Sequence, residues 1–158
     1  MQHSFTVLSG KRIHSQEGAA VQELGVRILV VEDYATWSHF ICSTLEQTQV
    51  LRVVLVVSNG LDAVQKASQL TPDLITLDIG LPGLDGIEAA RRILAFAPQA
   101  KIVFLSENRD PDIVQEALKT GARGYVLKSR AASELLLAVE EVLRGGTFVS
   151  KQLSLSND

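Results

Sequence analysis

The stretch Arg27-Ile28-Leu29-Val30-Val31-Glu32-Asp33 decides the fold. Its four consecutive apolar residues are typical of a strand that is buried on both faces, as in a parallel sheet. The run ends abruptly in two carboxylates, and Trp37, Ile41 and Leu45 then recur at helical spacing. Asp33 stands where it can cap that helix. The stretch therefore predicts a strand followed by a helix, with acidic residues at the junction.

This strand–helix unit repeats along the chain. Further strands are expected at 50–57, 74–77, 101–105 and 124–127, each followed by a helix that opens near Gly60, Gly86, Pro111 or Ala131. Alternating strands and helices of this length imply right-handed crossovers and a parallel sheet covered on both faces. The sequence thus predicts an α/β fold, a doubly wound (βα)5 sandwich around a five-stranded parallel sheet.

The composition narrows the class of protein. With 158 residues, 46% of them hydrophobic and 21% charged, the chain can bury one core of ordinary size. A net charge of -3 lacks the basic excess of a nucleic-acid binder, so we expect no nucleic acid to be bound by this chain alone. The single cysteine, Cys42, fits a reducing compartment, and we expect the cytoplasm. No apolar stretch approaches the ~18 residues of a membrane span, so no membrane role is expected.

Polar side chains stand where the predicted strands end. Glu32 and Asp33 follow the first strand, Asp78 the third, Ser106 the fourth and Lys128 the fifth. In a doubly wound sheet, ligands bind beyond the carboxyl ends of the strands, so these side chains are expected to converge. Clustered carboxylates repel one another unless a cation lies among them, and a set of oxygen ligands favours Mg²⁺ over zinc. We therefore expect a magnesium site at this edge.

Each of these residues alone also has an ordinary structural explanation. A single Asp at a strand end is more often a helix cap than a ligand, and a lysine before a polar loop is usually a solvated charge. Asp78 differs, because it ends a fully apolar strand and precedes the loop 79–86, which is rich in turn residues. The interpretation as a functional site rests on the coincidence of all these strand ends.

Four motifs carry a family resemblance: Val31-Glu32-Asp33, the run 78–86 (DIGLPGLDG), Leu105-Ser106 and the run 124–128 (GYVLK). In order and spacing they resemble the receiver domains of two-component response regulators, the CheY-like superfamily, whose fold is flavodoxin-like. The resemblance covers most of the chain, from about Arg27 to Arg144.

The resemblance implies that Asp78 accepts a phosphoryl group from a histidine kinase or phosphotransfer protein. It implies that Asp33, Asp78 and the carbonyl of Gly80 bind Mg²⁺ directly and that Glu32 acts through water. Mg²⁺ and Lys128 would neutralise the phosphoryl oxygens, which is most of what phosphoryl transfer requires from a protein. Such a domain is not an enzyme in the usual sense, because it catalyses only its own phosphorylation and dephosphorylation.

The resemblance also implies a switch. Ser106 would donate a hydrogen bond to the phosphoryl group and vacate space for the ring of Tyr125, changing the surface at about 110–143. Glu107 stands where a small residue is common in the family, and its charge predicts slow phosphorylation by small donors. Asn108, like Gly80, occupies a position that tunes phosphoryl lifetime in relatives.

Two further features resemble one branch of this family. Lys128-Ser129 and the run 143–150 (LRGGTFVS) resemble the NarL/FixJ group, whose receivers usually precede a LuxR-type helix-turn-helix. We therefore expect a mobile extension at 1–26, a receiver domain at 27–144, and at 145–158 a tail or the start of a linker to an output domain absent from this chain. Transcription regulation and homodimerisation on activation are the implied output.

Other classes fit less well. A haloacid-dehalogenase-type phosphatase needs Asp-x-Asp, but Gly80 stands two residues after Asp78, and no run matches the P-loop of nucleotide-binding enzymes. The remaining alternative is a phosphorylation-independent adaptor with a receiver-like fold. The intact Asp78 and Lys128 argue against it, and Glu107 keeps it open.

Overall fold

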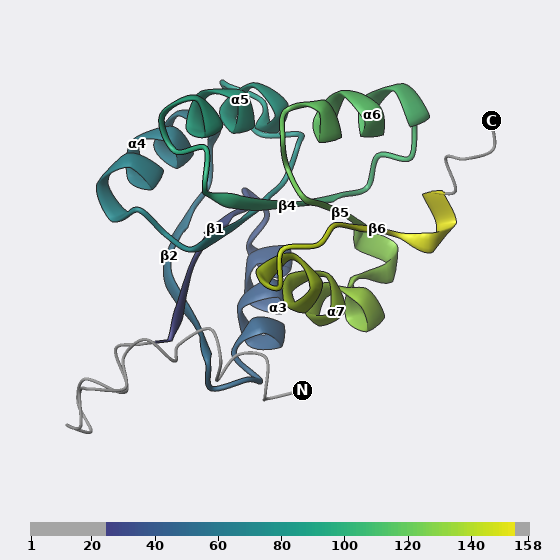
Figure 1. Cartoon of the computed structure of the whole chain (residues 1–158), viewed down its shortest axis with the longest axis horizontal. Helices are drawn as coiled ribbons and strands as arrows, with labels where there is room; N and C mark the ends of the chain where they lie inside the picture. The colour runs from purple at the N-terminus through teal and green to yellow at the C-terminus, as the bar shows by residue number, and fades with distance from the viewer. Residues whose placement is uncertain (1–24, 154–158) are drawn as a thin grey trace.

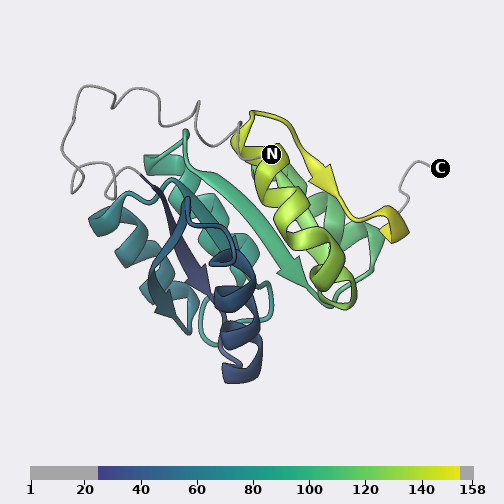
Figure 2. The ribbon, with the colours of Figure 1, turned by 90° about the horizontal axis from the view of Figure 1, so that it is seen from below.

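The structure is a computed structural model that describes residues 25–153. In that range a six-stranded, all-parallel sheet with the order β2-β1-β3-β4-β5-β6 is covered by helices on both faces (Figures 1 and 2). The elements, in chain order, are β1 (Val26–Val31), α3 (Ala35–Leu45), β2 (Leu51–Val57), α4 (Gly60–Leu70), β3 (Leu74–Leu77), α5 (Gly86–Phe96), β4 (Lys101–Ser106), α6 (Pro111–Lys119), β5 (Gly124–Leu127), η2 (Lys128–Arg130), α7 (Ala131–Leu143), β6 (Phe148–Val149) and η3 (Lys151–Leu153).

The predicted doubly wound α/β fold is confirmed, with one short strand more than the five that were expected. The extension expected at 1–26 lies outside the described residues except for its last two positions, and Val26 already begins β1. Among residues 25–153, no helix is both long and apolar enough to cross a bilayer.

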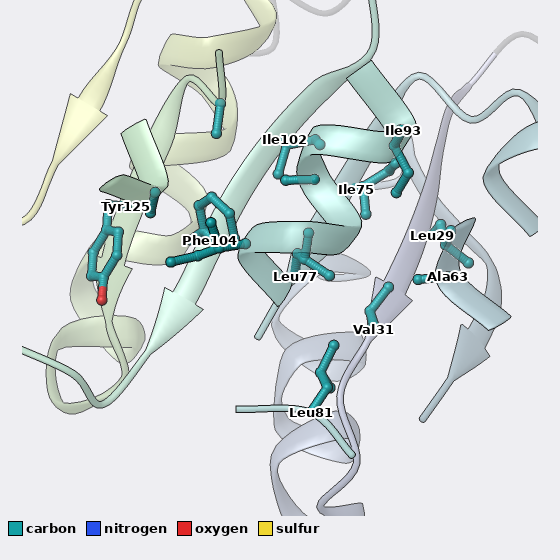
Figure 3. Close-up of a cluster of buried hydrophobic side chains, with 14 of the residues drawn as sticks. Leu29, Val31, Ala63, Ile75, Leu77, Leu81, Ile93, Ile102, Phe104 and Tyr125 are labelled. Carbon is teal, nitrogen blue, oxygen red and sulfur yellow. The ribbon is translucent and has the colours of Figure 1, made fainter. Parts of the chain in front are cut away.

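The strands form because each of their two faces meets a layer of helices. Successive residues of β1 alternate between the layers: Ile28 and Val30 join the core on the side of α3 and α7, whereas Leu29 and Val31 join the core on the side of α4, α5 and α6. Figure 3 shows part of the second of these cores, to which β1, β2, β3, β4 and β5 all contribute buried side chains. Burial on both faces explains the continuous apolar runs that predicted the strands.

Most helices begin at a side-chain cap. Asn59 accepts a hydrogen bond from the backbone N–H of Asp62 at the start of α4, and Asp85 and Asp110 act in the same way for α5 and α6. Helices α3 and α7 have no side-chain cap, and α3 begins after Tyr34. The interpretation of Asp33 as a helix cap is therefore wrong, and its carboxylate lies instead among other acidic groups at the sheet edge.

The chain after α7 returns to the sheet. Phe148 donates a backbone hydrogen bond to the carbonyl of Arg123 (3.0 Å), and Ser150 donates one to the carbonyl of Tyr125 (3.0 Å). Leu153 is buried in the core on the side of α4, α5 and α6. The folded part thus extends past Arg144 and includes most of the segment that the sequence pattern assigned to a tail or linker.

Candidate functional site

The order of the strands brings the candidate residues to one edge of the sheet. Strands β1, β3, β4 and β5 are neighbours and parallel, so their carboxyl ends lie together. A pocket of about 690 Å³ opens at this edge, and its lining residues are Glu32, Asp33, Tyr34, Trp37, Asp78, Ile79, Gly80, Ser106, Glu107, Asn108 and Lys128. All the residues singled out in the sequence line this pocket except Tyr125.

Lys128 is the positively charged centre of the pocket. Its Nζ atom lies 3.0 Å from Glu32 Oε1 and 3.4 Å from Asp78 Oδ2. The side chains of Lys128 and Glu32 are only 6% and 1% exposed, so little water screens this pair. Lys128 is therefore not a solvated surface charge. Its ammonium group links Glu32 to Asp78.

Carboxylates outnumber cations in this cluster. Glu32, Asp33 and Asp78 each offer an oxygen, and these oxygens lie within 4.8 Å of one another. Burial raises the pKa of both Glu32 and Asp78, and a neighbouring carboxylate raises each pKa further, whereas Lys128 lowers it. Three clustered carboxylates facing one ammonium fit a hard divalent cation such as Mg²⁺, which would relieve their repulsion.

The backbone around Asp78 is held closely by the following helix. The N–H of Ile79 donates to Asp78 Oδ1 (2.8 Å), and the N–H of Gly86 donates to the carbonyl of Ile79 (2.8 Å). A Cβ atom on Gly86 would lie 2.0 Å from the carbonyl oxygen of Asp78, whereas one on Gly80 would meet nothing within 4 Å. Only glycine at position 86 therefore lets α5 approach so near to Asp78.

The two expected switch residues are connected through Asn108. The backbone N–H of Asn108 donates to Ser106 Oγ (3.0 Å), and its carbonyl accepts a hydrogen bond from the hydroxyl of Tyr125 (2.8 Å). Tyr125 is fully buried beside Phe104, with 6.1 Å between the ring centroids, and burial raises the pKa of its hydroxyl. Ser106 thus lines the pocket, and Tyr125 lies behind it.

The sequence interpretation did not single out three residues that line the pocket, Tyr34, Trp37 and Ile79, and of these Trp37 contacts Lys128. Trp37 was assigned only to the apolar face of a helix, yet Lys128 Nζ lies 5.0 Å from the centroid of its ring. Trp37 follows Glu32 by five residues and Asp33 by four, and this short separation could have indicated that it lies near the site. A helix that starts directly after a strand end presents its first turn to the site at that end.

The fold and the pocket together define a receiver-type signalling domain. A family model described as "Response regulator receiver domain" matches residues 28–140. The chain therefore belongs to the response regulator receiver domain family, whose standard function is phosphorylation-dependent signalling in two-component systems. Receiver domains generally bind Mg²⁺ at an acidic pocket, and Glu32, Asp33 and Asp78 form such a cluster here.

Individual relatives agree with this family. The transcriptional regulatory protein LnrK of Bacillus subtilis is 31% identical over 129 residues, which are 82% of this chain and 59% of that protein. The chemotaxis protein CheY of Listeria monocytogenes is 33% identical over 119 residues, which are 75% of this chain and 99% of that protein. The chain thus spans under two thirds of the regulator and nearly all of CheY.

Solved structures show the same architecture. The crystal structure of a two-component response regulator of the LuxR family from Aurantimonas sp. SI85-9A1 superimposes with a TM-score of 0.79 and 29% sequence identity. The match covers 82% of this chain and 93% of that chain. The predicted family and its general signalling function are confirmed.

Proposed function

We propose that Asp78 of this chain accepts a phosphoryl group from the phosphohistidine of a histidine kinase or a phosphotransfer protein. A carboxylate oxygen of Asp78 bonds to phosphorus, the bond from phosphorus to the imidazole nitrogen breaks, and the released imidazole is protonated from water. The observation that carries the proposal is the contact of Lys128 Nζ with Asp78 Oδ2 in an acidic pocket. The only chemistry proposed is this acceptance and the later loss of the same phosphoryl group.

In this proposal the carboxylates of Asp33 and Asp78 and the carbonyl of Gly80 hold Mg²⁺. When bound, Mg²⁺ supplies positive charge to the oxygens of the phosphoryl group. Lys128 provides a second positive charge from the protein itself, and Glu32 fixes the ammonium through their buried ion pair. The raised pKa values of Glu32 and Asp78 support a cation here, because they reflect buried negative charge that is incompletely balanced.

The switch in this proposal starts at Ser106. Its hydroxyl now accepts a hydrogen bond from the N–H of Asn108, whose carbonyl holds the hydroxyl of Tyr125. If the Ser106 hydroxyl turns to donate to a phosphoryl oxygen, it loses its hydrogen bond with the N–H of Asn108. Asn108 can then move, which disturbs the hydrogen bond between its carbonyl and Tyr125. The response then reaches the surface at 110–143, which includes α6, β5 and α7.

We further propose that this surface controls a partner, a second copy of the chain or an output domain. The names of relatives such as LnrK and DegU, both called transcriptional regulatory proteins, support transcription regulation as the output. The proposed receiver domain runs from β1 through η3, that is from Val26 to Leu153, so it is longer than the expected range 27–144. The proposed location is the cytoplasm, because histidine kinases present their phosphohistidine there.

The experiment is phosphorylation by acetyl phosphate, followed by intact mass measurement. With Mg²⁺ we expect wild type to gain one phosphoryl group, and with a chelator to gain none. Asp78→Ala should stay unmodified, whereas Asp112→Ala, which removes an exposed carboxylate of α6, should be modified like wild type. An unmodified wild type, or equal modification of Asp78→Ala, would favour the phosphorylation-independent adaptor instead.

A further inference from the structure

Trp37 places an aromatic face beside the ammonium group of Lys128. The Nζ atom lies 5.0 Å from the centroid of the ring, within the ~6 Å over which a cation is attracted to the face of an aromatic ring. Trp is the aromatic side chain that attracts cations most strongly, and this contact lies in a partly buried pocket. We propose that Trp37 is a positioning residue that holds Lys128 in place for the phosphorylation of Asp78.

The orientation of the Trp37 ring is itself fixed. Trp37 and Phe40 lie three positions apart on α3, so their side chains meet on one face of the helix. Their rings are nearly perpendicular, at 88°, with 5.5 Å between the centroids, which is a favourable edge-to-face arrangement. Both rings also pack against the core on the side of α3 and α7. The aromatic face is therefore held toward Lys128 before any reaction takes place.

Trp37 matters because the other two partners of Lys128 have competing roles. Glu32 and Asp78 are the ammonium's carboxylate partners, and both belong to the acidic cluster that would hold a metal ion. Asp78 also changes its charge distribution when it is phosphorylated. The ring of Trp37 has no such second role, so its attraction for the ammonium persists while the carboxylates are engaged elsewhere.

The inference rests on the proposed function. Two measurements distinguish a failure of the inference from a failure of the proposed function. The first is NMR of the metal-free protein with labelled lysine, which reports on the Lys128 methylene protons next to Nζ. A ring face shifts these protons upfield, so we expect a clear shift in wild type, a smaller one in Trp37→Phe and none in Trp37→Leu or Trp37→Met. The same position of these signals in wild type and in both aliphatic variants overturns the inference.

The second measurement is the rate of phosphorylation by acetyl phosphate at saturating Mg²⁺. The rate should fall about tenfold in Trp37→Leu or Trp37→Met, and Trp37→Phe should restore most of it, as expected for loss of one desolvated cation–π contact. Affinity for Mg²⁺, measured by titration, should change less than about twofold, since no metal ligand is removed. Using two aliphatic variants keeps the test valid if one of them fails to fold.

Ile41→Val is the matched structural control. Ile41 is buried in α3 one turn after Trp37, so the change should lower the stability slightly and leave the phosphorylation rate unchanged. An equal fall of the rate in Ile41→Val and in Trp37→Leu would show that Trp37 acts only through packing, and would overturn the inference. A wild type that is never phosphorylated refutes the proposed function, whereas the NMR shifts still decide whether Trp37 holds Lys128.

Discussion

Lys128 and Glu32 form a buried ion pair, with 3.0 Å between Nζ and Oε1. Asp78 contacts the same ammonium at 3.4 Å, and Asp33 adds a third carboxylate whose oxygen lies within 4.8 Å of those of Glu32 and Asp78. The pair alone does not neutralise the cluster, so the metal-free protein keeps excess negative charge at the end of its sheet. This excess has consequences for stability as well as for phosphorylation.

The first prediction is that this excess charge destabilises the metal-free fold above mildly acidic pH. Burial raises the pKa of Asp78 in the folded protein above its ordinary value of 3.8. Asp78 then binds a proton more tightly in the folded protein than in the unfolded chain. The free energy of unfolding therefore falls as the pH rises from 3.8 through the pKa that Asp78 has in the folded protein. Removing the charge by Asp78→Asn should therefore raise the free energy of unfolding at about pH 7.

Urea denaturation without divalent ions checks this prediction. The advantage of Asp78→Asn over wild type should shrink as the pH is lowered toward the ordinary pKa, and Mg²⁺ should stabilise wild type more than the variant. Asp112→Asn, in which an exposed carboxylate of α6 is lost, is the control for a simple change in net charge. An Asp78→Asn variant that is less stable than wild type at neutral pH would show that the carboxylate is well balanced by Lys128.

The second prediction concerns Gly80 and Gly86, two of the three glycines in the run 78–86. Gly86→Ala would bring a Cβ atom to 2.0 Å from the carbonyl oxygen of Asp78, so the helix or the strand end must shift. We expect a loss of about 1–3 kcal/mol in the free energy of unfolding and slower phosphorylation of the displaced Asp78. Gly80→Ala meets no neighbour within 4 Å and should stay within about 0.5 kcal/mol of wild type. Equal stability of the two variants would contradict this account of Gly86.

The third prediction concerns the segment that follows α7. The hydroxyl of Ser150 accepts a hydrogen bond from the N–H of Leu127 (2.9 Å) and donates one to the buried carboxylate of Glu134. Ser150→Ala leaves both groups without this partner and should cost about 1–3 kcal/mol. Ser133→Ala removes an exposed hydroxyl of α7 and should change stability by less than about 0.5 kcal/mol. Hydrogen exchange should show faster opening of β6 in the first variant only.

Not every part of this fold was equally visible in the sequence. Strands β3 and β5 are buried on both faces, so their apolar runs gave the correct bounds. The two-residue strand β6 is too short to have a periodicity, and only its hydrogen bonds with β5 define it.

The residues of the site also differ in how well the sequence predicts their positions. The acidic cluster was predictable because carboxylates at parallel strand ends must converge. The role of Trp37 depends on which way a helix side chain points, and the helical spacing of apolar residues does not contain that information.

The fourth prediction concerns Glu107 at the rim of the pocket. Its side chain is exposed and lines the same opening as the acidic cluster, so an anionic donor approaches against one more negative charge. Glu107→Ala and Glu107→Gln should both speed phosphorylation by acetyl phosphate about two- to fivefold, the range expected for one exposed charge. The gain should shrink as salt is added, because ions screen exposed charges over about 10 Å at 0.1 M. Asp112→Asn controls for net charge, and labelling of Glu107→Ala at the wild-type rate would show that Glu107 does not limit access to Asp78.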